Sequence, residues 1–233
     1  MTDITKLLTL FDKWAYGKQP ATAFNELVDT IIIPFKVCGT PEEAEAQLAI
    51  VTGHPRKDTL ASIANCIGEL SEGFRDPLGE LYMQKVSHGH MGQYFTPEHV
   101  CDLMAQCSIE TPKDGSRVLD PACGSGRMLL AAAKINRHLI CYGADVDITC
   151  CKMALLNMLL QSLTGEIANM DSLSNEFFTG YKARTTLLNG FYHPNYVEFT
   201  EPEKSAIWLR PKAKPDIVFP EKTAGTYHQT TLF

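Results

Sequence analysis

The sequence predicts an α/β protein in which a parallel sheet with helices on its faces follows a helical module. Three observations support this prediction. Apolar side chains recur at helical spacing up to about residue 85, strand-like and helix-like segments alternate from about residue 95, and a connector with two glycines separates the two parts. We therefore expect a helical module over residues 1–88 and an α/β domain over residues 89–233.

The helical module contains several separate helix signals. Apolar side chains at helical spacing predict helices around Leu7–Ala15 and Leu60–Leu70, and a further helix is expected over Leu78–Lys85. Thr40 supplies a capping hydroxyl, with a proline next and a glutamate three residues after the cap. This pattern predicts a helix over Pro41–Val51.

The second part of the chain alternates between the two kinds of element. Strands are expected at 117–120, 139–143 and 167–170, with helices starting near residues 96, 128 and 149. Strand, helix, strand, helix and strand in this order predict a parallel sheet. Beyond residue 172 the helical signal fades, and the remaining strand candidates are short: 185–188, 196–199, 206–209 and 217–219.

Length, composition and charge exclude several classes of protein. The 233 residues are 45% hydrophobic, which is typical of one globular core with a small module. A net charge of −6 does not favour a protein that binds nucleic acid by bulk charge. Because no apolar run approaches 20 residues, we expect no membrane span. Because no signal peptide is visible, we expect a cytoplasmic location and eight reduced cysteines. Because Cys-x-x-Cys pairs are absent, no metal site is expected.

The most informative segment is Val118–Gly126, where a predicted strand carries Asp120 into a glycine-rich turn and a helix follows. Only glycine lets the backbone approach a ligand closely there, and the helix start offers unpaired N–H groups. A dinucleotide fingerprint would need a third glycine at position 129, which is Leu129, and the Gly-Lys-Ser/Thr of a phosphate loop is absent. An acidic residue at the strand end favours a cationic or hydroxyl-rich ligand over a pyrophosphate.

These residues resemble the S-adenosylmethionine-dependent adenine-N6 DNA methyltransferases, and in particular the modification subunits of type I restriction systems. Asp120-Pro-Ala-Cys-Gly-Ser-Gly126 is similar to their cofactor signature, and Gln93-Tyr-Phe-Thr-Pro97 is similar to the segment that closes over the methionine part of the cofactor. Asp76-Pro-Leu-Gly-Glu-Leu-Tyr82 resembles the end of the family's helical domain. The resemblance implies a Rossmann-like methyltransferase core that uses S-adenosylmethionine.

The expected cofactor site combines this resemblance with residue chemistry. Asp120 can face the cationic methionine end, and Asp145, after the second strand, can accept both ribose hydroxyls. Asp147 is better explained as a helix cap than as a second ligand. The resemblance implies that Asp171 contacts the adenine amine. The complete set of expected cofactor residues is Tyr94, Phe95, Thr96, Pro97, Asp120, Ala122, Cys123, Gly124, Ser125, Gly126, Asp145, Val146, Asp171 and Ser172.

The catalytic motif of the family, Asn/Asp-Pro-Pro-Tyr/Phe, is absent from the sequence. The best substitute is Asn189-Gly190-Phe191-Tyr192, with Asn189 and Gly190 as acceptors for the target amine and Tyr192 for stacking on a flipped base. Both prolines are missing, so an altered active loop and a degenerate inactive loop are weighted equally. A rival segment is Asp216-Ile-Val-Phe-Pro220. Cys123 belongs to the cofactor turn and is not expected to act as a nucleophile.

The expected function is S-adenosylmethionine-dependent methylation of adenine N6 in DNA. The alternatives are a cofactor- or DNA-binding relative without catalysis and a methyltransferase for RNA or protein. Only 60 residues follow position 173, too few for a full seven-stranded sheet, so a shortened sheet and a specificity-type partner subunit are expected. The final residues, Gln229–Phe233, resemble a sliding-clamp docking peptide, although packing on the core is the favoured explanation.

Overall fold

The computed structural model describes residues 4–87, 94–188 and 190–210. The predicted catalytic Asn189, the strand candidate at 217–219 with its rival motif 216–220, and the clamp-like peptide Gln229–Phe233 therefore lie outside the described residues. No helix in the described ranges is both long and apolar enough to cross a bilayer.

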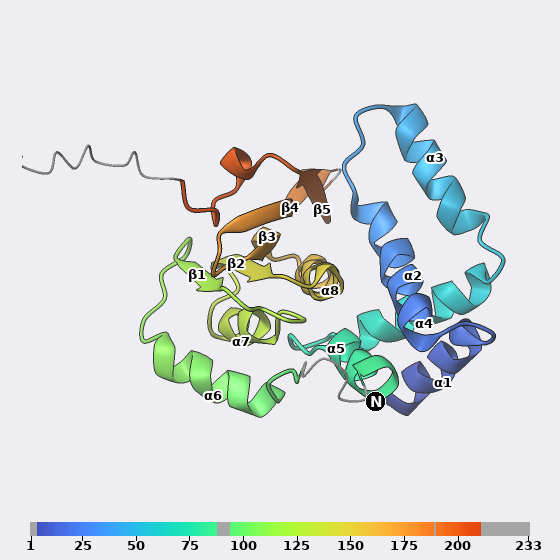
Figure 1. Ribbon diagram of the computed structural model, residues 1–233, viewed down its shortest axis with the longest axis horizontal. Helices are drawn as coiled ribbons and strands as arrows, with labels where there is room; N and C mark the ends of the chain where they lie inside the picture. The colour runs from blue at the N-terminus through green and yellow to red at the C-terminus, as the bar shows by residue number, and fades with distance from the viewer. Residues whose placement is uncertain (1–3, 88–93, 189, 211–233) are drawn as a thin grey trace, which may run out of the picture.

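Five α-helices make up the helical module (Figure 1). Their bounds are α1 Ile4–Ala15, α2 Pro20–Ile32, α3 Pro41–Thr52, α4 Lys57–Leu70 and α5 Pro77–Tyr82. A short 3-10 turn, Ile33–Phe35, follows α2. The helix expected over Leu78–Lys85 ends earlier as an α-helix, because a π-helical turn, Met83–Ser87, continues it.

The start of α3 has the predicted cap. Thr40 Oγ1 accepts a hydrogen bond of 3.2 Å from Glu43 N, and Pro41 occupies the first turn, where its missing N–H costs nothing. By contrast, no residue of α3 is buried. The other helices surround large buried side chains such as Trp14 and Phe24. This core extends into the α/β part through three residues of one long helix: Cys150, Met153 and Leu156.

The described residues form one five-stranded sheet in the order β1-β2-β3-β4-β5. The strands are β1 Arg117–Asp120, β2 Ile140–Asp145, β3 Thr164–Asp171, β4 Glu176–Leu188 and β5 Phe191–Phe199. The helices of this part are α6 Glu98–Ser108, α7 Arg127–Ile135 and α8 Ile148–Leu160. Helices α7 and α8 cover one face of the sheet (Figure 1). The first three strands are parallel, as predicted, and the sheet is Rossmann-like over this part.

The last two strands correct the sequence prediction. They run antiparallel to their neighbours, so the sheet is mixed, and the short candidates at 185–188 and 196–199 are the ends of much longer strands. The candidate at 206–209 is not a strand. Ser205 Oγ accepts the N–H groups of Ile207 and Trp208 at 3.0 and 3.1 Å, which removes those donors from a sheet ladder.

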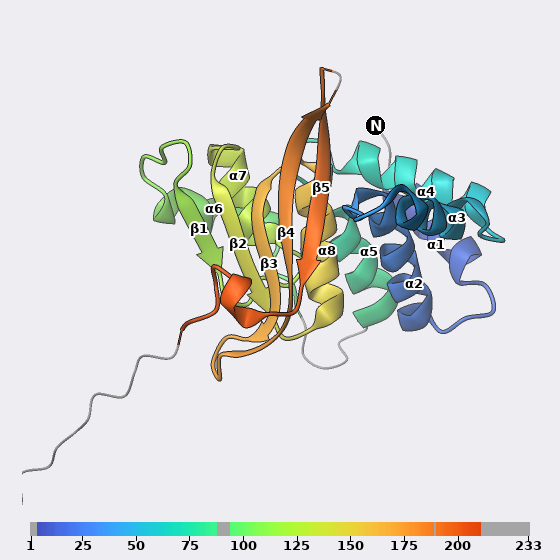
Figure 2. The same ribbon diagram turned by 90° about the horizontal axis from the view of Figure 1, so that it is seen from above.

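The sheet has two different edges along the strand direction. We define the carboxyl edge by the ends of β1, β2 and β3, and the amino edge by their beginnings. Strand β4 starts at the carboxyl edge, where Glu176 pairs with Asp171, and reaches the amino edge where Ala183 pairs with Gly165. It then continues beyond the amino edge, and Figure 2 shows the tip of the β4–β5 hairpin projecting past the other strands.

Candidate cofactor site

Three carboxylates meet at the carboxyl edge. Asp120, Asp145 and Asp171 are the last residues of β1, β2 and β3. The parallel register pairs Asp120 with Gly143 and Asp145 with Asn169, so each acidic residue lies two positions beyond the partner of the preceding one, at the same edge of the sheet. Ligands of parallel α/β sheets bind at this edge. The structure thus brings together the three acidic residues expected from the sequence.

The turn after β1 leaves no room for a side chain at its two glycines. Gly124 has φ +52°, and a Cβ there would lie 3.0 Å from the ring of Phe95. Gly126 has φ +88° and caps α7, and a Cβ there would lie 3.2 Å from Ala154 Cβ. Cys123 N also donates to Ala144 O at 2.8 Å, which ties the turn to β2. Both glycines are therefore required by conformation and by space.

Asp145 organises the turn as well as facing the site. Its Oδ2 accepts from Gly124 N at 2.8 Å, and its Oδ1 accepts from Asp147 N at 2.9 Å. Gly126 N donates to Cys123 O. The N–H groups of Gly124 and Gly126, which were expected to face a ligand, therefore both have acceptors within the chain. Asp147 caps α8 by accepting from Thr149 N at 2.7 Å, in agreement with the helix-cap interpretation.

The carboxylates differ in their electrostatic environment. Burial raises the pKa of Asp120 above its ordinary value, and the charge of Asp145 adds to this effect, although the N–H of Ala122 opposes it. The pKa of Asp171 is lowered, first of all by the hydrogen bond from Leu173 N at 2.9 Å. A cation bound beside Asp120 would offset the cost of ionising this carboxyl group.

The cysteine of the turn is enclosed by the protein. Cys123 is buried, and burial raises the pKa of its thiol well above the ordinary value. A protonated thiol in an apolar setting is unreactive at neutral pH. Cys150 and Cys151 are also buried in the cores around α8, as expected from the sequence, and burial raises their pKa values too.

The segment before α6 covers the turn. The ring centroid of Phe95 lies 5.6 Å from the ring centroid of Tyr82. It lies 5.7 Å from the guanidinium carbon of Arg127. Thr96 O accepts from Arg127 Nη1 at 3.2 Å, while the side chain of Tyr94 is exposed. The remaining expected residues adjoin this site: Pro97 caps α6, Ala122 and Val146 are exposed, and Ser172 Oγ donates to Pro121 O.

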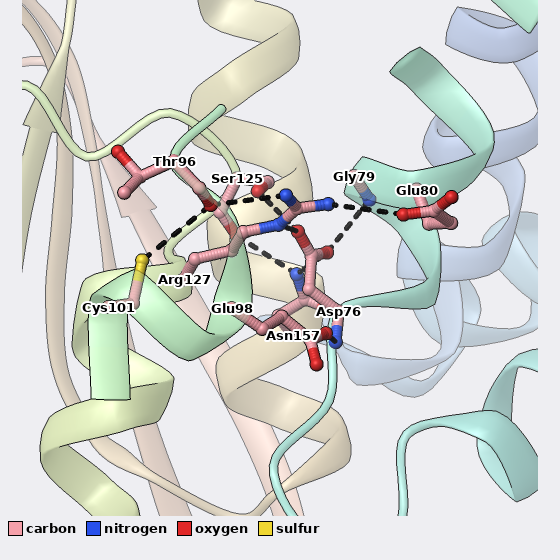
Figure 3. Close-up of polar contacts among 9 residues, drawn as sticks. All are labelled: Asp76, Gly79, Glu80, Thr96, Glu98, Cys101, Ser125, Arg127 and Asn157. Carbon is pink, nitrogen blue, oxygen red and sulfur yellow. Dashed lines mark hydrogen bonds and ion pairs between the residues drawn. The ribbon is translucent and has the colours of Figure 1, made fainter. Parts of the chain in front are cut away.

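Two polar residues of the site lie outside the set of site residues expected from the sequence, although Asp76 begins one of the segments that resemble the family. Asn169 is buried on β3, and its amide donates to the carbonyls of Asp145 and Val146, which holds the loop after β2. Asp76, from the start of α5, reaches the glycine turn through Ser125 (Figure 3). These two residues are 49 positions apart, so no spacing rule connects them. Only the structure places them together.

Comparison with known proteins agrees with this geometry. The N-6 DNA methylase family model matches residues 75–226, which is more than half of the chain. The chain belongs to this family. The match begins just before α5 and includes the glycine turn and all three strand-end carboxylates.

Curated relatives of this chain are larger proteins. The chain is 28% identical over 188 residues to the type I restriction enzyme MpnII methylase subunit of Mycoplasma pneumoniae, covering 73% of this chain and 34% of the relative. It is 30% identical over 124 residues to the MjaVIII methylase subunit of Methanocaldococcus jannaschii, covering 48% and 21%. Among solved structures, a Listeria monocytogenes protein described as a class I S-adenosylmethionine-dependent methyltransferase superposes with a TM-score of 0.46 at 18% identity, covering 70% and 52%.

The described residues of the expected catalytic loop, Gly190 and Tyr192, lie away from the glycine turn. Leu188 pairs with Phe191 at the far end of the hairpin, and Gly190, with φ +82°, lies in its turn. Tyr192 is 73% exposed and lines a cavity of about 710 Å³ at the amino edge, next to Arg137 and His138. The β4–β5 hairpin thus places Gly190 and Tyr192, the described residues of the expected catalytic loop, at the opposite edge of the sheet from Gly124.

Proposed function

We propose that this N-6 DNA methylase binds S-adenosylmethionine at the carboxyl edge and transfers its methyl group to N6 of adenine in DNA. The single observation that carries the proposal is the arrangement of Asp145, whose carboxylate reaches Gly124 N while lying at the strand end beside Asp120. A glycine turn that a Cβ would fill, flanked by carboxylates, suits a ligand with a positive charge and a pair of hydroxyl groups.

Each strand-end residue has a proposed role toward the cofactor. Asp120 faces the ammonium and sulfonium charges, Asp145 accepts from the ribose hydroxyls, and Asp171 with Ser172 contacts the adenine ring. The segment Tyr94–Pro97 covers the methionine end. When bound, the cofactor supplies a methyl group on a positively charged sulfur. The chain's own contribution is to orient this group and to exclude water with the ring of Phe95.

DNA as the substrate rests on the relatives, which are methylase subunits of type I restriction enzymes. With a net charge of −6, the chain has little general attraction for a polyanion. We therefore propose that a specificity-type partner subunit supplies most of the DNA contacts and the sequence preference. The match covers about a third of the Mycoplasma pneumoniae relative, so substrate and partner remain parts of this proposal.

A second candidate function is cofactor binding without methyl transfer. The specific observation in its favour is the position of the β4–β5 hairpin, which puts Gly190 and Tyr192 at the amino edge, away from the glycine turn and the three carboxylates. The rest of the sequence contains no such tetrapeptide. A relative of this kind would keep the glycine turn and the three carboxylates and would lack the acceptors for the target amine.

Two linked measurements test the proposal. Calorimetric titration with S-adenosylmethionine should give saturable binding, and no binding at millimolar ligand would contradict both candidates. Transfer of a labelled methyl group is then measured with DNA, RNA and protein acceptors, with and without a specificity-type subunit. N6-methyladenine in digested DNA supports the proposed enzyme. Binding without transfer to any acceptor supports the second candidate, and label in RNA or protein alone would replace DNA as the substrate.

A further inference from the structure

We propose that Asp76 is a positioning residue: from the helical module, it holds the glycine turn in the shape that receives the cofactor. The inference rests on the cofactor site proposed above. Its consequence is that cofactor affinity depends on a residue outside the strand ends and the turn, in a part of the chain that has no expected contact with the ligand.

The carboxylate of Asp76 is 1% exposed and accepts four hydrogen bonds (Figure 3). Its Oδ1 accepts from Gly79 N and from Asn157 Nδ2, both at 2.8 Å. Its Oδ2 accepts from Ser125 Oγ at 2.5 Å and from Arg127 Nε at 2.6 Å. These four donors come from α5, α8, the glycine turn and α7, so one buried side chain joins the two parts of the molecule.

Ser125 is held on both sides. Its hydroxyl donates to Asp76, and its carbonyl oxygen accepts from Asn157 Nδ2 at 2.9 Å. Since Ser125 stands between Gly124 and Gly126, the two glycines cannot change their backbone angles freely without breaking one of these buried bonds. Leaving a buried polar group unpaired is costly, so the network restrains the most flexible part of the site.

The same carboxylate also sets the position of the covering segment. Arg127, bonded to Asp76 through Nε, donates through Nη1 to Thr96 O and carries its guanidinium 5.7 Å from the ring centroid of Phe95. Its Nη2 lies 3.8 Å from Glu80 Oε2. Asp76 therefore holds the glycine turn through Ser125, and it holds the segment Tyr94–Pro97 through Arg127.

The absence of a side chain at Gly79 leaves room for the contact between Asp76 and Ser125. A Cβ at position 79 would overlap the Asp76 carboxylate and lie 2.7 Å from Ser125 Oγ. A methyl group there would act as a wedge between the two side chains without removing any charge or hydrogen-bonding group. Gly79→Ala is thus an independent way to disturb the same contact.

The main test is the dissociation constant of S-adenosylmethionine, measured by calorimetry for Asp76→Asn, Ser125→Ala and the double variant. The amide of Asp76→Asn keeps the size of the side chain but turns a donor toward a site surrounded by donors. The expected loss of affinity is about 10-fold to 100-fold, the usual effect of removing a residue that orients a ligand-binding group. Because both residues act through one contact, the double variant should lose little more than Asp76→Asn alone.

Glu166→Gln is the matched control. Glu166 is also a buried carboxylate, 2% exposed, and accepts from Ser205 Oγ at 2.5 Å and from Ala206 N, on β3 away from the turn. We expect Glu166→Gln to lower the melting temperature as Asp76→Asn does while leaving the dissociation constant within about twofold of the wild type. At saturating cofactor, any transfer rate of Asp76→Asn should recover, since the variant changes binding of the cofactor and not the reacting groups.

The outcomes separate this inference from the proposed function. If the wild type binds no S-adenosylmethionine, the cofactor site itself is refuted, and this inference with it. If the wild type binds but Asp76→Asn binds equally well, or if the Asp76→Asn and Ser125→Ala losses are additive, the positioning role alone is overturned. If Asp76→Asn does not fold, Ser125→Ala and Gly79→Ala provide the test. Unchanged affinity for S-adenosylmethionine in both variants would overturn the inference, and reduced affinity in both would support it.

Discussion

Two turns of this chain contain glycines with a positive φ and differ in their surroundings. In the turn after β1, a Cβ at Gly124 or Gly126 would meet Phe95 or Ala154 within about 3 Å. In the turn between β4 and β5, Gly190 also has a positive φ, yet a Cβ there would meet nothing within 4 Å. The first turn is packed against Phe95 and Ala154 and hydrogen-bonded to Asp145 and Asp76, whereas Gly190 of the second turn is exposed.

A positive φ alone therefore does not identify a ligand-binding site. Gly190 serves the local reversal of a hairpin, for which an Asn-Gly pair is a strong signal. Gly124 and Gly126 bring the backbone close to other parts of the chain, and hydrogen bonds to Asp145 and, through the buried Ser125, to Asp76 hold it there. A preorganised turn of this kind suits binding, since its order does not have to be created by the ligand.

The largest difference between the two turns should appear in stability. Gly126→Ala combines a left-handed backbone with a Cβ 3.2 Å from Ala154, so we expect a loss of about 3 kcal/mol in the free energy of unfolding. Gly190→Ala has only the backbone cost, about 1 kcal/mol. Urea denaturation of both variants measures these values. Equal losses would show that packing around the first turn contributes nothing.

The next largest effect concerns cofactor affinity. Asp145→Asn weakens the acceptor for the ribose hydroxyls and disturbs its bond to Gly124 N, so the dissociation constant of S-adenosylmethionine should rise about 10-fold to 100-fold. Calorimetry measures the change. Glu198→Gln, on β5 in an exposed ion pair with Lys36, is the control and should bind as the wild type does. Wild-type affinity in Asp145→Asn would remove this carboxylate from the site.

A smaller effect is expected for the stability of Asp120→Asn. The folded-state pKa of Asp120 is raised above its ordinary value of 3.8, so its ionisation destabilises the folded protein as the pH rises through and above that value. The variant should be more stable than the wild type at pH 7, by about 0.5 kcal/mol, and the difference should vanish below pH 3.8. Denaturation curves at both pH values check the sign, and a variant less stable at pH 7 would contradict it.

The smallest effect is expected at the hairpin tip. Tyr192→Ala removes an exposed ring at the amino edge, so cofactor affinity and any methyl transfer should remain within about twofold of the wild type. The same calorimetric and labelled-methyl measurements apply. A loss of methyl transfer with unchanged folding would show that the hairpin acts in catalysis and would contradict the distinction between the two turns.

Local signals predicted much of this fold. The cap at Thr40, the three parallel strands and the acidic residues at their ends all follow from patterns within a few residues of each other. The direction of β4 does not, because pairing with β3 over many residues decides it. The surroundings of Gly190 and Asp76 depend on similar long-range contacts: pairing of β4 with β5 places Gly190 at the amino edge, and Asp76 meets Ser125 across 49 positions of the chain.

The most direct test of the central claim is a map of where the cofactor touches the chain. Ultraviolet irradiation of the protein with radiolabelled S-adenosylmethionine attaches the label to nearby residues, and digestion followed by mass spectrometry locates it. We predict label within residues 94–126 or 143–172, the segments that meet at the carboxyl edge. Label confined to residues 184–197, in the β4–β5 hairpin, would contradict the account.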